Sequence, residues 1–92
     1  MPYIPQDARP KHQSAIDNTV KKLVALTDEN DVGGNMNYII SSICNRWLKE
    51  SGGTRYYKIE KLIGCLECIK LELYRRVAAE YEDKAIDKNG DI

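Results

Sequence analysis

The stretch from Thr54 to Tyr81 constrains the fold more than any other part of this sequence. It contains no Pro and a single Gly, Gly64, and it opens on Thr54, a residue type that can cap the start of a helix. At 1.5 Å per residue, a helix over this stretch is about 40 Å long. That is long for a chain of 92 residues, so we expect the other elements to be organised around it.

This predicted helix is apolar on two sides. The first side is an aliphatic seam with spacings of three and four residues, formed by Ile59, Leu62, Leu66, Ile69, Leu73 and Val77. The opposite side, called the Gly64 face below, carries Tyr57, Gly64, Cys68 and Leu71. A surface helix is normally polar there. We expect a partner helix against the Gly64 face, most simply from a second copy of the chain, because a two-fold dimer uses the same patch twice. The alternative is that the chain's own other helices cover it.

Gly64 is the notable residue of that face. In the middle of a helix it costs about 1 kcal/mol relative to Ala. Together with Cys68 one turn later, it forms a notch of small residues that another backbone can approach closely. A close-packed copy at this notch would be disrupted by Gly64→Leu.

Two further helices are predicted before the long one. Pro10 suits the first turn of a helix over residues 10–27, whose apolar positions repeat with an amphipathic period. Asn35 or Asn37 can cap a second helix over residues 35–51, with Gly33 and Gly34 in the preceding loop. Ser51, Gly52 and Gly53 are expected to end it.

These elements predict an all-α protein: a three-helix bundle with a long C-terminal helix over residues 54–81. We expect residues 1–92 to form a single domain in which the first two helices pack on the aliphatic seam. Residues 1–9, with their prolines, are predicted to form an extended N-terminal arm. Residues 82–92 are predicted to form a charged C-terminal tail.

Composition narrows the classes of function and location. Fourteen basic residues balance fourteen acidic residues, which disfavours nucleic acid as a partner. No window of 18 apolar residues could span a membrane, and the first residues do not resemble a signal peptide. We therefore expect a cytoplasmic protein with reduced cysteines.

Candidate chemical sites are weak. Cys65 and Cys68 have C-x-x-C spacing, but they fall in mid-helix rather than at a helix N-terminus, where the dipole activates a thiol. A zinc site would also need Cys44 and His12 to converge on them. Glu80 and Asp83 share a helix face at the spacing of some Mg²⁺-dependent hydrolases, without a second acidic pair on a facing helix. We expect no catalytic residue, metal or cofactor, and no enzymatic activity.

Several segments together resemble a known group of proteins. They are the opening Met1-Pro-Tyr-Ile-Pro5, Met36-Asn-Tyr-Ile-Ile40, the run from Gly64 through Glu67 and Lys70 to Arg76, and Tyr81-Glu-Asp83 with Asn89-Gly-Asp91. This pattern resembles a family of small uncharacterised proteins from bacteriophage and prokaryotic genomes. The resemblance implies an accessory role in such a setting and brings no catalytic residues. Relatives tend to have Pro where this chain has Glu80, which would let the long helix continue.

The sequence thus favours a small homo-oligomeric protein-interaction protein of accessory function. It would bind itself, and another protein, through the Gly64 face or the C-terminal tail. One alternative is a nucleic-acid-associated phage accessory protein. Another is a metal-dependent hydrolase that uses the helix-end carboxylates Glu80 and Asp83.

Overall fold

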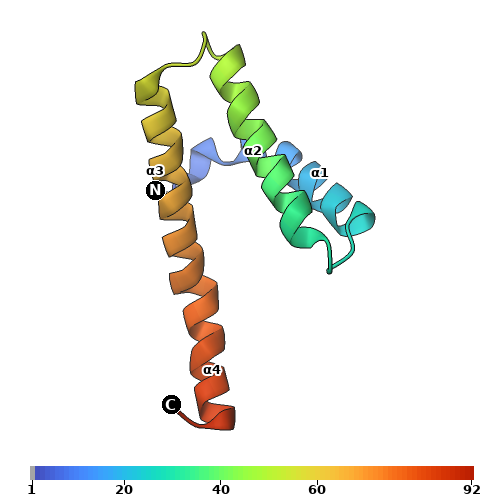
Figure 1. The fold of residues 1–92 in the computed structure, drawn as a ribbon, viewed down its shortest axis with the longest axis vertical. Helices are drawn as coiled ribbons and strands as arrows, with labels where there is room; N and C mark the ends of the chain where they lie inside the picture. Colours follow the sequence, from blue (N-terminus) through green and yellow to red (C-terminus); the bar gives the residue numbers. More distant parts are fainter. Residues whose placement is uncertain (1) are drawn as a thin grey trace. The chain divides into compact units, whose positions relative to one another are not determined.

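A computed structural model describes residues 2–92, all of whose regular elements are helical. The chain divides into two units, residues 3–55 and residues 56–92 with Pro2. The first unit holds a short 3₁₀ turn and two helices, and the second holds one long helix (Figure 1). The predicted all-α class is therefore confirmed, and the packing of the first two helices on the aliphatic seam stays a prediction.

The first unit begins with a 3₁₀ turn, η1 (Gln6–Ala8), and helix α1 (Pro10–Leu26). The guanidinium Nε of Arg9 donates to the carbonyl oxygen of Ile4 at 3.0 Å, which ties the N-terminal arm to the start of α1. Pro10 occupies the first turn as expected, since its missing N–H has no acceptor there. The helix ends where Thr27 takes an extended conformation.

Helix α2 (Val32–Glu50) begins three residues earlier than predicted. The turn before it is closed by Asp28, whose carbonyl accepts from the Asp31 N–H at 3.0 Å and whose carboxylate accepts from the Asn30 N–H at 3.1 Å. Because the chain has already reversed at Asp31, Gly33 enters the first helical turn and is not part of a loop. Asn35 is not the cap, since its N–H already donates to the Asp31 carbonyl at 3.1 Å within the helix.

The predicted stop after α2 is confirmed. The N–H of Ser51 donates to the Trp47 carbonyl at 3.0 Å, and the next two residues, Gly52 and Gly53, both have φ of +101°. That left-handed region is strained for residues with a Cβ atom. The second unit then starts at Tyr56, two residues after Thr54.

The C-terminal helix, as we call residues 56–89, consists of α3 (Tyr56–Leu73), a π-helical turn η2 (Tyr74–Ala78) and α4 (Ala79–Asn89). These 34 residues form one continuous rod (Figure 1, yellow to red). It ends where Gly90 takes φ of +91° and donates its N–H to the Ile86 carbonyl at 2.8 Å.

The predicted C-terminal tail over residues 82–92 is wrong for its first eight residues, which are helical. The charge density that indicated a tail is compatible with a solvated helix. Glu80 and Lys84 form an i,i+4 ion pair at 3.4 Å that supports it. No Gly or Pro interrupts the sequence until Gly90.

Candidate interaction surfaces

Side-chain burial is the feature that most bears on function. Among residues 2–92, none is fully buried, whether apolar or polar. All six Tyr side chains are exposed, from 45% for Tyr3 to 75% for Tyr56. A globular domain buries most of its large apolar side chains, so the apolar faces of these helices are open surfaces.

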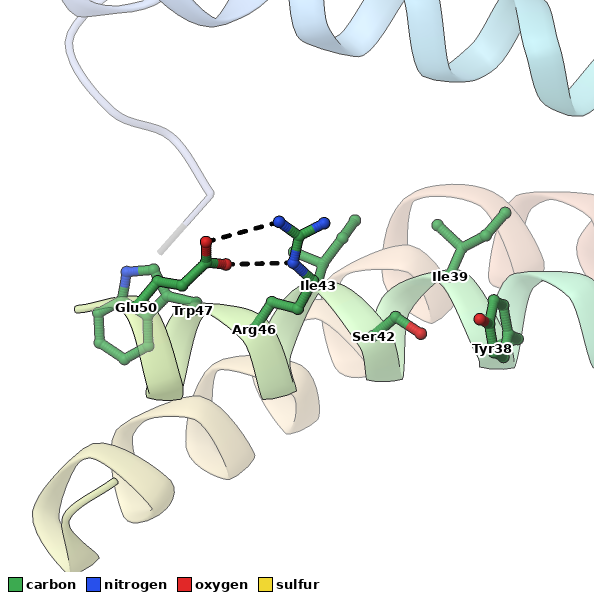
Figure 2. A pocket seen from close by; sticks show the side chains of 7 residues that line it. All are labelled: Tyr38, Ile39, Ser42, Ile43, Arg46, Trp47 and Glu50. Atoms are coloured by element: carbon green, nitrogen blue, oxygen red, sulfur yellow. Dashed lines mark hydrogen bonds and ion pairs between the residues drawn. The ribbon is translucent and has the colours of Figure 1, made fainter. Parts of the chain in front are cut away.

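One such surface lies on α2. Tyr38, Ile43 and Trp47 line this surface and are 74%, 59% and 47% exposed, with Tyr38 and Trp47 at its two edges (Figure 2). Beside them, the carboxylate of Glu50 accepts two hydrogen bonds from Arg46, at 3.1 Å from Nε and 3.5 Å from Nη2 (Figure 2). The ion pair is four residues apart and mostly solvated, so it supports the helix only modestly.

A second surface is the groove between α1 and α2. Leu23 and Leu26 of α1 line it together with Tyr38 and Ile39 of α2. Leu23 and Ile39 are only half-buried there, and Leu26 remains 79% exposed. The two helices therefore lie alongside this groove without enclosing a core.

The predicted Gly64 face lies entirely on α3, which is regular α-helix through Leu73. Its members are exposed: Tyr57 at 55%, Leu71 at 58%, and Gly64 and Cys68 likewise. A Cβ atom built on Gly64 meets nothing within 4 Å. No neighbour among the described residues therefore requires a glycine at this position.

The aliphatic seam becomes more exposed toward its C-terminal end. Ile59 and Leu62 are half-buried, whereas Leu73 and Val77 are 59% and 61% exposed. Beyond the seam, Tyr81 is 71% exposed. These last three residues line a shallow apolar groove with Tyr74 and Ala78.

The π turn aligns the apolar side chains of this groove. Leu73, Val77, Tyr81 and Ala85 follow one another at intervals of four residues. In a regular α-helix each interval advances about 40° beyond a full turn, so the series would rotate by about 120°. The π turn contains one additional residue, which removes about 100° of that rotation. The four side chains thus form a nearly straight line, called the apolar row below.

A second series with the same spacing runs beside the apolar row, one residue earlier. This charged row consists of Glu72, Arg76, Glu80 and Lys84. Within the chain, Glu72 forms an ion pair with Arg75, and Glu80 forms one with Lys84. Sequence reasoning missed both rows because it treated residues after Tyr81 as a tail. The four-residue spacing was the available signal.

The residues considered for chemistry do not assemble into a site. Cys65 and Cys68 are exposed on α3, Cys44 is half-buried on α2, and His12 is exposed on α1. Across residues 2–92, no three His, Cys, Asp or Glu side chains gather at a distance suited to a metal ion. Glu80 and Asp83 are both exposed on α4.

The fold and its surfaces define a small all-α protein with open apolar helix faces. None of its described helices combines the length and apolar character needed to cross a membrane. The chain belongs to the family described as a domain of unknown function (DUF6899), whose model matches residues 1–92. Neither curated proteins nor solved structures gave a match.

Proposed function

We propose that this protein is a small homo-oligomeric protein-interaction protein with an accessory role. The observation that carries the proposal is the lack of any fully buried side chain among residues 2–92. A domain of this size needs a hydrophobic core to be stable. Copies of the chain that pack their open helix faces together would supply that core.

Tyrosine usage supports the same proposal. Tyr is enriched where proteins meet, because its ring contributes apolar area and its hydroxyl stays hydrogen-bonded. This chain has six Tyr and no Phe, and its single Trp, Trp47, lies on an exposed side of α2. Exposed Tyr and Trp side chains of this kind suit a surface that is solvated in the free chain and covered by a protein partner in the complex.

The Gly64 face is the surface we propose for a partner helix. Tyr57 and Leu71 offer apolar side chains at its two ends, and Gly64 between them lets another backbone approach. Self-association and partner binding can use different faces, since the C-terminal helix is apolar on two sides. We propose that the protein is of bacteriophage or prokaryotic origin and makes these contacts in the cytoplasm.

The test is the solution mass of the full chain by light scattering across a concentration series. We expect a mass of at least twice 10.5 kDa at the higher concentrations. A mass of one chain at every concentration would refute self-association.

A further inference from the structure

The C-terminal helix is much longer than either helix of the first unit. The C-terminal helix has 34 residues and is about 51 Å long, whereas α2 has 19 residues and is about 28 Å long. A helix as long as α2 covers little more than half of the C-terminal helix, and the exposed apolar row lies in its C-terminal half.

We propose that a second copy of the chain covers the apolar row, with the two C-terminal helices antiparallel about a two-fold axis between Ala78 and Ala79. This deepens the proposed self-association by naming its face, orientation and register. The first reason is the symmetry of the apolar row. A two-fold axis at this point brings Val77 beside Tyr81 of the partner subunit, and Leu73 beside Ala85 of the partner subunit.

The charged row has the same symmetry with opposite signs. Its pairs centre on Ala78, one residue from the Ala79 centre of the apolar pairs. An axis between these two residues therefore brings Arg76 beside Glu80 of the partner subunit, and Glu72 beside Lys84 of the partner subunit, within about 1.5 Å of level along the helix. Each contact occurs twice because the interface is isologous. A parallel two-fold pair would instead place the two charged rows on opposite sides of the interface, so Arg76 would not meet Glu80 of the partner subunit.

The net charges of the two segments on either side of the proposed axis also favour the antiparallel arrangement. Residues 70–76 carry three basic side chains and one acidic side chain, for a net charge of +2. Residues 81–87 carry one basic side chain and three acidic side chains, for a net charge of −2. The antiparallel arrangement lays one segment along the other. Opposite potentials of this kind fix orientation more than they raise affinity.

The residues at the axis permit close contact. Ala78 and Ala79 are small and half-buried, so two helices can approach each other there. The π turn matters to the arrangement because it keeps Tyr81 and Ala85 in line with Leu73 and Val77. The Gly64 face points away from this contact and stays available for another protein.

The experiment measures the dimer dissociation constant of the full chain by sedimentation equilibrium, for the wild type and two matched variants. Val77→Glu should raise the constant roughly 100-fold or more, because each dimer would bury two unpaired carboxylates. Leu71→Glu, a similarly exposed aliphatic residue on the Gly64 face, should change it little. Circular dichroism checks that each variant keeps its helices.

Orientation is tested with cysteines in a background where Cys44, Cys65 and Cys68 are replaced by Ser. A mixture of the Leu73→Cys and Ala85→Cys chains should form a disulfide between the two different chains, whereas each variant alone should not cross-link. Cross-linking of each variant with itself would indicate a parallel pair and overturn the proposal. This readout holds even if Val77→Glu fails to fold.

The outcomes separate the two proposals. A wild-type chain that stays monomeric refutes self-association and, with it, this interface. A wild-type dimer that survives Val77→Glu and dissociates with Leu71→Glu keeps self-association but moves the interface to the Gly64 face. Dissociation with Val77→Glu alone, together with the mixed disulfide, is the expected result.

Discussion

The backbone N–H of Ala79 donates to the carbonyl oxygen of Tyr74, five residues earlier in the chain. An α-helix would pair residues four apart, so this bond marks the one extra residue of the π turn. Such turns are rare and frequently coincide with functional positions. Here the turn lies where the apolar row crosses from α3 into α4.

Deletion of Ala78 should convert the π turn into regular α-helix without disturbing the apolar row. Ala79 then follows Val77 directly, and Tyr81 and Ala85 keep their direction because the removed residue offsets the regular helical drift. We expect unchanged helicity and an equal or higher melting temperature by circular dichroism. Deletion of Lys61 is the control, since α3 has no extra residue there and its two ends would rotate apart by about 100°. Equal damage by both deletions would contradict this account of the π turn.

Replacement of Gly64 by Ala should stabilise the chain. The position is mid-helix with open space around a Cβ atom, so we expect a gain of about 1 kcal/mol in the free energy of unfolding. The same change at Gly53, whose φ is +101°, should destabilise by roughly 1–2 kcal/mol, since an L-residue is strained there. Denaturant titration measures both. A Gly64→Ala variant that is less stable only at concentrations where the chain associates would indicate close packing at this residue.

Replacement of Glu80 by Pro should break α4. Proline removes the N–H and clashes with the preceding turn, at a cost of roughly 3 kcal/mol. Hydrogen exchange should speed up for residues 76–89, and the mass should fall toward that of one chain. Glu80→Ala is the control that keeps the helix and loses the ion pair to Lys84, which lies 3.4 Å away, together with the proposed contact to Arg76 of the partner subunit. Slow exchange that persists in the proline variant would show that α4 does not depend on continuity with α3.

Two variants with opposite charge reversals should form heterodimers with each other in preference to homodimers. Arg76→Glu and Glu80→Arg each place like charges across the proposed interface, so each variant alone should dimerise more weakly than the wild type. Mixed together, they should prefer the heterodimer, because opposite charges then meet at every contact. Native mass spectrometry of the mixture gives the ratio of the two homodimers to the heterodimer. A statistical 1:2:1 distribution would show that these residues do not face each other.

Sequence periodicity predicted the helices themselves well, because each is marked by its own pattern of apolar residues. Pro10 and the Gly52–Gly53 pair also identified one start and one stop. The start of α2 was misplaced because Gly33 and Gly34 favour loops as residue types, whereas the turn at Asp28 had already completed the reversal. The π turn left no such mark, since neither Gly nor Pro occurs in residues 74–78.

The neighbour of each apolar helix face could not be predicted from periodicity in the same way. The Gly64 face and the aliphatic seam were both readable from spacing, yet spacing alone does not say which of two apolar faces takes a partner. That choice depends on the length of the neighbouring helices and on charges far apart in the sequence. Tyr81 aligned with the apolar row only through the π turn, and Ala85 joined it only because α4 continues to Asn89.

The lack of fully buried side chains in residues 2–92 also determines how folding responds to abundance. If association supplies the core, folding and assembly form a single equilibrium, and the midpoint of thermal unfolding rises with protein concentration. Dilution alone would then unfold the chain, and proteases would remove it. Expression level would act as a threshold: below it the chain is degraded, and above it the chain persists as an assembly.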